Sequence, residues 1–241
     1  MAVKRLDRLL SELGVATRSE LRQMIKSGRV TVDGAAAVRP DMKIEEQGHS
    51  ICVDGAELCT NRLRYFMMDK PEGVLSATED KRQETVLDIL PPDIRRIGLF
   101  PVGRLDKDTS GLLLLTNDGD FAHRVISPKS GIEKLYYAEV DGTPDEADVK
   151  AFEDGIVLGD GTKCLPAKLV PLGGNRCHVI VMEGKYHQVK RMLASRGKPV
   201  VKLRRLAVGA LELDRTLAPG EAKELGGGDI AKVLGSFVLD N

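Results

Sequence analysis

The stretch Gly103-Arg104-Leu105-Asp106-Lys107-Asp108-Thr109-Ser110-Gly111 is a polar segment between two apolar ones, residues 97–102 and 111–116. The pattern predicts two strands joined by a loop with a glycine at each end. Loops on a rigid sheet often present catalytic side chains, and Asp106 is the first candidate here. A simpler alternative is a charged turn, in which Asp106 caps backbone amides or pairs with neighbouring cations. The rest of the chain decides between these interpretations.

The composition is that of a folded protein with few aromatic side chains. Its 241 residues suffice for one large domain or two smaller ones. Hydrophobic residues, at 42%, can fill a core, and charged residues, at 30%, can keep the surface hydrated. Aromatic residues make up 4% and Trp is absent, so any recognition of nucleobases has to depend on a few Tyr, His and Phe side chains.

The charges are unevenly distributed although the formal net charge is zero. Residues 1–43 carry nine Lys and Arg against five Asp and Glu, and residues 185–205 carry eight Lys and Arg and no acid. Two basic surfaces on a neutral molecule are typical of a protein that binds phosphates, and so indicate a nucleic-acid partner.

The cysteines and the chain start indicate the compartment. Cys52, Cys59, Cys164 and Cys177 form no Cys-x-x-Cys pair and stand in apolar settings, so we expect free thiols rather than disulfides or a zinc site. The first residues contain no apolar signal segment, and no apolar run approaches membrane-spanning length. We therefore expect a cytoplasmic protein with no membrane partner and no metal.

The N-terminal segment has the pattern of two helices and a hairpin. Leucines at helical spacing predict a helix over residues 5–13, and Thr17 with Glu20 has the spacing of a capping box that begins a second helix. Residues 30–32 alternate as a strand into the turn Asp33-Gly34. One face of the second helix carries a cation every fourth residue, which is either a solvated face or a phosphate-binding one: Arg18, Arg22 and Lys26, with Arg29 just beyond.

This order of elements resembles the small RNA-binding domain named after ribosomal protein S-four, over residues 3–60. The resemblance implies that Arg18, Arg22, Lys26 and Arg29 face RNA phosphates. Residues 56–62 are then expected to be the linker to a second domain.

The rest of the chain mixes predicted strands and helices at irregular spacing. Expected strands cover residues 63–68, 97–102, 111–116, 135–140, 164–172, 176–182, 200–203 and 208–213. Expected helices cover residues 85–90, 120–126, 186–195 and 229–234, with another that begins at a cap on Thr143 and Pro144 and reaches residue 154. The mixture predicts an α+β fold on a mixed, largely antiparallel sheet.

Four motifs in this part of the chain resemble those of the pseudouridine synthases, and specifically the RsuA type, which modifies ribosomal RNA and carries the S-four-like module. They are Lys70-Pro71-x-Gly73, the stretch from Gly103 to Gly119 containing Asp106, Lys134-x-Tyr136-x-Ala138-x-Val140, and Glu183-Gly184-Lys185-x-His187-Gln188-Val189-x-Arg191-Met192. The resemblance covers nearly the whole chain. It implies an S-four-like domain at 1–60 and a catalytic domain at 61–241.

The resemblance implies catalysis by one aspartate without a cofactor, and Asp106 is the matching residue. It would act either as a nucleophile or as a base on the ribose; the sequence leaves both routes open. An ionised Asp in a pocket that excludes water needs a cation beside it. Lys190 matches the basic partner, with Arg191 as the alternative; helix neighbours point about 100° apart, so we expect only one of them to reach Asp106.

The target base would have to be flipped out of folded RNA, and Tyr136 matches the tyrosine that stacks on it. Core packing is the alternative role for Tyr136. Further RNA contacts are expected from Arg104, Lys185, His187 and Arg191, with Arg204 and Arg205 as additional phosphate ligands. A structural role for His187, as a cap or core residue, is equally open. Lys107 and Asp108 are expected to form a surface ion pair.

The predicted function is isomerisation of a uridine in 16S ribosomal RNA. The S-four-like module and a compact chain, without a long basic extension after Asn241, favour the small subunit. A 23S rRNA synthase of the same family is one alternative, and a non-catalytic RNA-binding assembly factor is another. We expect a monomer whose substrate is ribosomal RNA within a small-subunit assembly intermediate.

Overall fold

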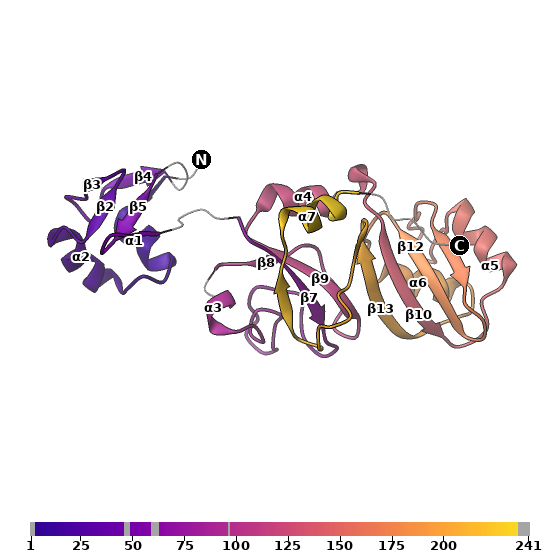
Figure 1. Cartoon of the computed structure of the whole chain (residues 1–241). Helices are drawn as coiled ribbons and strands as arrows, with labels where there is room; N and C mark the ends of the chain where they lie inside the picture. Colours follow the sequence, from indigo (N-terminus) through magenta and orange to yellow (C-terminus); the bar gives the residue numbers. More distant parts are fainter. Residues whose placement is uncertain (1–2, 46–48, 59–62, 96, 236–241) are drawn as a thin grey trace. The chain divides into compact units, whose positions relative to one another are not determined.

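The computed structural model describes residues 3–45, 49–58, 63–95 and 97–235. The chain divides into two compact units, Met1–Leu63 and Arg64–Asn241, and each is described by itself (Figure 1). The predicted boundary after residue 60 lies outside the described residues.

The first unit packs two helices on short strands. Its elements are β1 (Val3–Arg5), α1 (Leu6–Glu12), α2 (Arg18–Lys26), β2 (Val30–Val32), β3 (Ala35–Ala36), β4 (Lys43–Glu45), β5 (Ile51–Val53) and β6 (Ala56–Leu58). One sheet has the order β3-β2-β5-β6, and β1 pairs with β4. The expected linker over residues 56–62 is therefore wrong at its start, because β6 pairs with β5 in the antiparallel direction.

Local sequence explains both helices. The Thr17 hydroxyl accepts a hydrogen bond from the Glu20 amide, and the Glu20 carboxylate accepts one from the Thr17 amide at 2.9 Å, which confirms the capping box. Gly28, at φ +73°, ends the helix because the left-handed conformation suits glycine. Apolar stripes of the two helices meet in one core that includes Leu6, Leu10 and Leu21.

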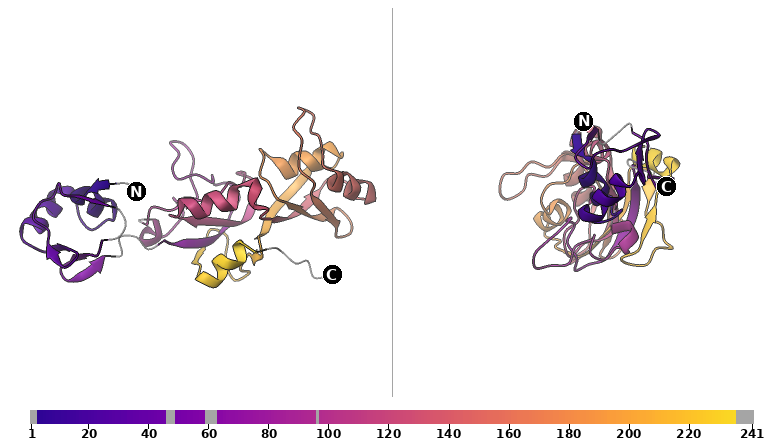
Figure 2. Two further views of the ribbon diagram at one scale, coloured as in Figure 1. Left: turned by 90° about the horizontal axis from the view of Figure 1, so that it is seen from above. Right: turned by 90° about the vertical axis from the view of Figure 1, so that its left-hand side faces the viewer.

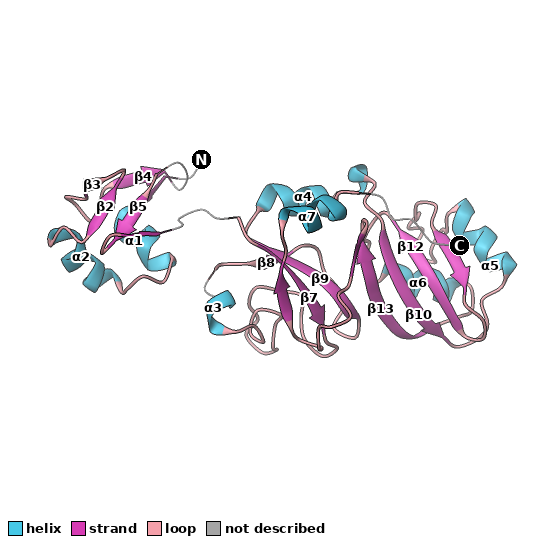
Figure 3. Cartoon of the chain, in the orientation of Figure 1, coloured by secondary structure: helices cyan, strands magenta, loops and turns pink. Residues whose placement is uncertain are grey.

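The second unit is built on one long sheet with helices against it (Figure 3). Its elements are β7 (Tyr65–Lys70), α3 (Pro92–Arg95), β8 (Phe100–Pro101), β9 (Ser110–Thr116), α4 (Gly119–Ile126), a 3₁₀ turn (Pro128–Ser130), β10 (Lys134–Val140), α5 (Glu146–Asp154), β11 (Lys168–Pro171), β12 (Arg176–Val181), α6 (Gln188–Ser195), β13 (Val200–Val208), β14 (Leu211–Glu212), β15 (Ala222–Glu224) and α7 (Gly227–Val233). The strand order is β11-β12-β10-β13-β9-β7-β15, with β14 on β13 and β8 on β9. The α+β class and the largely antiparallel sheet are confirmed.

One parallel pairing sets the geometry of the molecule. Strands β13 and β9 run parallel at Arg204 opposite Ser110 and Arg205 opposite Gly111, whereas the other strand pairs are antiparallel. A Cβ on Gly111 would lie 2.2 Å from the Arg205 carbonyl oxygen, and its φ is +104°, so only glycine fits there. The close approach brings the loop before β9 next to the chain that leads into β13.

Three large apolar clusters and a small one around Leu135 hold the sheet. Helices α5 and α6 lie on the same side of the sheet (Figure 2), where Phe152 and Met192 pack on β10, β12 and β13. Helices α4 and α7 share a second cluster with β7 and β9. A third cluster, formed with residues 74–105, packs on β7 and β9 through Phe66 and Leu113.

Several predicted elements differ from the structure. Residues 85–90 form turns rather than a helix, and Pro92 begins α3. Helix α5 is capped by Asp145, not Thr143, because the Asp145 carboxylate accepts a hydrogen bond from the Asp148 amide. Of the strand expected over residues 97–102, only β8 forms. The strand expected over residues 200–203 continues to residue 208 as β13, and the strand expected over residues 208–213 is reduced to β14.

Candidate active site

A buried lysine holds the central loop. The Lys70 side chain is fully buried, and its Nζ donates to the carbonyl oxygens of Pro71 at 2.9 Å, Asp106 at 3.2 Å and Thr109 at 2.9 Å. Burial lowers the pKa of Lys70 to about 8, although nearby carboxylates oppose the shift. The Ser76 hydroxyl bonds both backbone groups of Leu105. The loop backbone is therefore fixed on both sides of Asp106.

The Asp106 carboxylate lies beside a cation from helix α6. Lys190 Nζ is 3.1 Å from Asp106 Oδ2, and His187 Nε2 is 3.4 Å from Asp106 Oδ1. Lys190 also bonds Asp108. Burial opposes the charged form of Lys190, but its bonds to Asp108 and Asp106 outweigh burial and raise its pKa. The hydrogen bond from Lys190 in turn lowers the pKa of Asp108.

Asp106 faces a cavity of about 840 Å³. Residues 75–78, 101–107, 125–126 and 183–187 contribute to its wall, and the sheet contributes Leu114, Lys134, Tyr136, Arg205 and Val208. The wall thus combines apolar side chains with a few polar ones, a pattern typical of small-molecule and nucleobase pockets. Asp106, Tyr136, Arg104, Lys185 and His187 are all brought to it.

A buried carboxylate shapes the start of α6. Glu183 accepts hydrogen bonds from the Leu165 amide and the Gln188 side-chain amide, each at 2.9 Å. It also pairs with Lys185, whose Nζ donates to the Lys163 carbonyl at 2.7 Å. The Lys185 ammonium is therefore engaged within the protein.

His187 has a strained backbone at the rim of the cavity. It precedes α6 in the left-handed conformation, with φ 47° and ψ 37°, and makes no side-chain cap. Its ring stacks on Tyr186 with centroids 3.9 Å apart, and the Tyr186 side chain is exposed. His187 occupies the N-cap position of α6, but its ring makes no cap hydrogen bond and is 38% exposed, so the ring has neither a capping nor a core role.

Two further expectations about the basic residues of this unit can be compared with the structure. Of the two candidate partners of Asp106, only Lys190 reaches it, as the helix geometry predicted, and Arg191 pairs with Asp160 instead. The expected ion pair between Lys107 and Asp108 is absent from the described residues, since Lys107 donates to Gln83 at 2.8 Å.

The basic face of the first unit is partly neutralised by an acid that the sequence pattern did not reveal. Asp7, on α1, is fully buried and accepts from Arg5 and from Arg18 at 3.1 Å; Arg22 Nε is 4.0 Å away. Burial opposes ionisation of Asp7, but the bonds from Arg5 and Arg18 keep its pKa below the usual value.

The other two cations of that face differ from each other. Arg29 forms a two-point bond with Asp54, at 2.6 and 2.5 Å. Lys26 takes part in no ion pair in the part of the unit that the structure describes, and its side chain is exposed. Lys26 is therefore the cation with the least internal engagement.

The structure adds two buried cations to the cavity wall. The sequence predicts no individual role for Lys134 and a phosphate contact for Arg205, yet both are more than nine-tenths buried. Arg205 Nε donates to the Leu112 carbonyl at 2.7 Å, and Nη1 lies 3.5 Å from the Tyr136 hydroxyl. The signal in the sequence was the spacing of Lys134 and Tyr136, because alternate residues of a strand share one face.

No group of three or more His, Cys, Asp or Glu side chains that could hold a metal occurs in the described residues. Within the same ranges, no helix combines the length and apolar character needed to cross a bilayer.

The described cysteines are free thiols. Cys164 and Cys177 are buried, Cys52 is half-buried, and Cys59 lies outside the described residues. Burial raises the pKa of Cys177 to about 11, so it is an inert core residue rather than a reactive thiol.

Comparisons with known proteins identify the family of the chain. The sequence profile of the RNA pseudouridylate synthase family matches residues 64–195, and that of the S4 domain matches residues 4–48. A crystal structure of a pseudouridylate synthase superposes with a TM-score of 0.68 at 34% identity, covering 95% of this chain and 99% of that one.

Relatives in bacteria match over nearly their full length. The chain is 43% identical to an uncharacterized RNA pseudouridine synthase, YtzG, of Bacillus subtilis, covering 92% of this chain and 94% of that protein. It is 40% identical to ribosomal small subunit pseudouridine synthase A of Vibrio cholerae, covering 95% and 99%. It is also 38% identical to ribosomal large subunit pseudouridine synthase B of Bacillus subtilis, covering 92% of each. The chain therefore belongs to the RNA pseudouridylate synthase family, with an S4 domain ahead of the synthase region.

Proposed function

We propose that this protein isomerises a single uridine of 16S ribosomal RNA to pseudouridine, with Asp106 as its catalytic carboxylate. The observation that carries the proposal is the carboxylate of Asp106 held 3.1 Å from Lys190 at the wall of a cavity that Tyr136 also lines. A pure RNA-binding factor has no need of a carboxylate among phosphate-binding cations, so this arrangement favours the enzyme over the non-catalytic alternative.

The chemistry follows from the bonds that change. The bond from ribose C1′ to base N1 breaks with its electron pair going to N1, the base turns, and C5 bonds to C1′ while the C5 proton leaves. Asp106 either attacks C1′ or removes a ribose proton, and both routes begin with an ionised carboxylate. Lys190 keeps that ionised form favourable after RNA has displaced water from the cavity.

The cavity is large enough for one flipped nucleoside, since ligand pockets are typically about 300–1,000 Å³ and this one is about 840 Å³. Tyr136 then stacks on the uracil. Arg104, which is exposed beside the loop, contacts the RNA backbone or fills the space that the base has left.

Other cations bind the RNA outside the cavity. In this account the S4 unit provides Arg18, Arg22, Lys26 and Arg29, and the synthase unit provides Lys185, His187 and Arg191. Several of these cations pair with a carboxylate in the free protein and leave it to bind an RNA phosphate. Arg191, for example, leaves Asp160. We assign no metal and no cofactor to the reaction.

The choice of substrate is supported by full-length relatives that are named as small-subunit enzymes. A 23S rRNA site is the second candidate, because a large-subunit synthase matches at nearly the same identity. We further propose that the protein is a cytoplasmic monomer acting on RNA within a small-subunit assembly intermediate.

Transcripts of 16S and 23S rRNA carrying tritium at C5 of uridine test the proposal, since isomerisation releases that tritium to water. We expect release of one equivalent from 16S RNA, or from a partly assembled small subunit, and none with Asp106→Asn. Release from 23S RNA alone would move the substrate to the large subunit. No release from either RNA, free or in ribosomal particles, would contradict the proposed activity.

A further inference from the structure

Lys134 and Arg205 form a buried cationic pair at the cavity wall. Lys134 keeps 8% of its surface exposed and Arg205 keeps 5%. Lys134 Nζ donates to the Ile132 carbonyl at 2.7 Å, and Arg205 Nε donates to the Leu112 carbonyl at 2.7 Å. Neither forms an ion pair with a carboxylate anywhere in the described ranges, whereas the buried carboxylates Asp69 and Asp148 are both paired with cations.

Strand geometry places both cations on the wall of the cavity. Lys134 and Tyr136 are two residues apart on β10 and so share a face of the sheet. Tyr136 stands opposite Arg205 in the register with β13, and the Arg205 guanidinium lies 6.0 Å from the Tyr136 ring centre. Lys134, Tyr136 and Arg205 therefore form one patch, and all three line the cavity that contains Asp106.

Two buried cations side by side destabilise the folded protein unless a negatively charged group binds next to them. A buried cation without a counter-charge loses hydration that a single carbonyl bond replaces only in part, and two such cations repel each other. Burial and the proximity of Arg205 lower the pKa of Lys134 to about 8. Strained charges of this kind concentrate where a developing charge has to be stabilised.

The proposed reaction generates a negative charge in the cavity that this pair lines. When C1′–N1 breaks, the bonding electron pair stays on the base, and resonance spreads the charge of the released uracil anion over N1, O2 and O4. This holds whether Asp106 forms a bond to C1′ or removes a ribose proton. The uracil anion is thus common to both routes.

We propose that Lys134 is a catalytic residue whose ammonium, supported by Arg205, stabilises the uracil anion between cleavage of the N1 bond and formation of the C5 bond. The inference rests on the proposed function. An RNA phosphate is the other anion that could meet these cations. The base is favoured, because the pair is buried beside Tyr136 whereas exposed cations such as Arg104 stand nearer the solvent.

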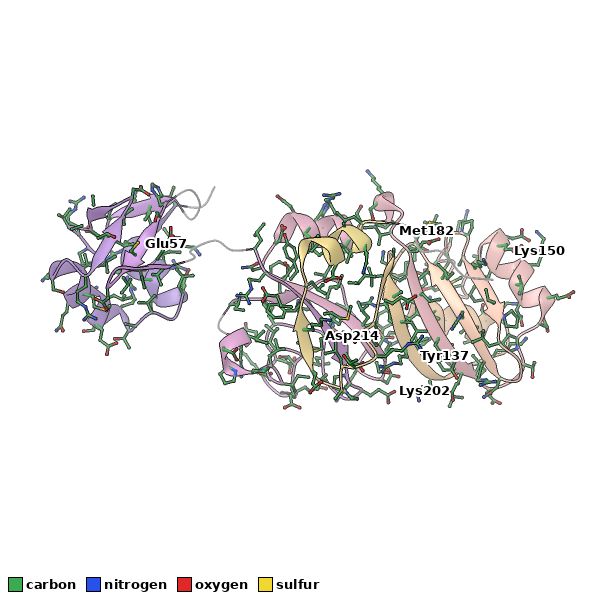
Figure 4. The ribbon with its side chains drawn as sticks, in the orientation of Figure 1. Glu57, Tyr137, Lys150, Met182, Lys202 and Asp214 are labelled. Carbon is green, nitrogen blue, oxygen red and sulfur yellow. The ribbon has the colours of Figure 1, made fainter. Side chains whose placement is uncertain are left out.

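The test replaces Lys134 by Met, which keeps the length and removes the charge. The single-turnover rate at saturating RNA should fall by about 100-fold, as for loss of one donor to a developing oxyanion, while RNA affinity and its salt dependence stay as in the wild type. Lys134→Arg, which keeps the charge, should recover part of the rate. Lys150→Met is the matched control, because Lys150 extends into solvent from α5 (Figure 4).

A second substrate separates a catalytic role from a structural one. RNA with 5-fluorouridine at the target releases a more stable anion, so its first step, followed as loss of 5-fluorouridine from RNA digests, should depend less on Lys134. An equal loss of rate on both substrates would indicate a structural effect and overturn the inference. Loss confined to RNA affinity, with a shallower salt dependence, would assign the pair to a phosphate.

Two controls keep the outcomes distinct. Lys134→Gln retains a donor for the Ile132 carbonyl and repeats the comparison if Lys134→Met does not fold. A wild-type protein without activity on any rRNA contradicts the proposed function itself. An active wild type with Lys134→Met at the same rate contradicts only this inference.

Discussion

Lys190 Nζ lies 3.1 Å from Asp106 Oδ2, although the two residues come from helix α6 and from the loop before β9. The parallel pairing of β9 and β13 accounts for the meeting, because α6 leads directly into β13. The carboxylate is therefore placed by the sheet topology, and its charge partner by the helix. The proposed chemistry depends on this contact.

Asp106→Asn should abolish turnover, because the amide can neither form the ester nor accept the ribose proton. RNA affinity should change little, since the carboxylate contributes no attraction to phosphates. Tritium release and filter binding on the same protein measure both quantities. Full activity in a clean preparation of Asp106→Asn would remove Asp106 from the mechanism.

Lys190→Met should lower the single-turnover rate by about 100-fold, because the ionised Asp106 loses its charge partner in a water-excluding site. Asp108→Asn is the matched control: it removes the other carboxylate bonded to Lys190 and leaves the pair with Asp106 in place. It should keep most of the activity. The assignment of Lys190 is contradicted if the two variants lose rate equally.

The double reversal Arg22→Glu with Lys26→Glu should weaken RNA binding steeply and spare the chemical step at saturating RNA. The slope of log K against log salt should flatten by about 2 if each cation meets one phosphate. Lys150→Glu with Lys168→Glu makes the same charge change on exposed residues of the synthase unit. A binding constant that is equal for both doubles would exclude the α2 face as an RNA surface.

Gly111→Ala should reduce the free energy of unfolding of the synthase unit by about 2–4 kcal/mol, since the methyl group meets backbone and φ is positive. Gly173, at φ +87° with open space around it, isolates the conformational part of the cost. Gly173→Ala should cost about 1 kcal/mol in the same urea titration. An equal loss of unfolding free energy at the two positions would show that β13 leaves enough space at Gly111 for a methyl group.

Asp148 should stabilise the synthase unit at neutral pH but not in acid. Burial opposes its ionisation, but bonds from Lys198, the Asp145 amide and Arg196 hold its pKa below the usual value. A lowered folded-state pKa gives stability that is complete above the unfolded-state value of about 3.9 and is lost as pH falls through the folded-state value.

Asp148→Asn should therefore cost about 3 kcal/mol at pH 7, with a difference from the wild type that shrinks below about pH 4. Asp154→Asn, on the exposed side of α5, is the control, because the solvent-exposed pair of Asp154 with Lys150 should contribute little to stability. Urea titrations at pH 7 and pH 3 measure the effect. If Asp148→Asn lowers the free energy of unfolding by the same amount at both pH values, Asp148 does not stabilise the unit through its charge.

Local patterns allowed accurate prediction where a structure depends on residues close in sequence. The capping box of Thr17 and Glu20 and the helix over Gly119–Ile126 are of this kind. Helical spacing also explains why Lys190 reaches Asp106 while Arg191 turns to Asp160.

Contacts between distant residues could not be predicted in the same way. The pairing of Arg18 with the buried Asp7 depends on how α1 packs against α2. The course of residues 85–90 depends on tertiary packing, since Val86 and Leu87 fill the core under β9 without forming a helix. The sequence predicts Arg205 as a surface phosphate ligand, whereas its strand β13 lies between β10 and β9 and the side chain is buried.

The central claim is that this protein makes one pseudouridine in 16S rRNA through Asp106. The most direct test maps pseudouridines, by chemical labelling and primer extension, in rRNA from cells that lack the gene and carry either the wild-type copy or Asp106→Asn. We predict that one 16S position loses its modification, regains it with the wild-type copy and stays unmodified with Asp106→Asn. A modification pattern that is unchanged at every position of both rRNAs would contradict the account.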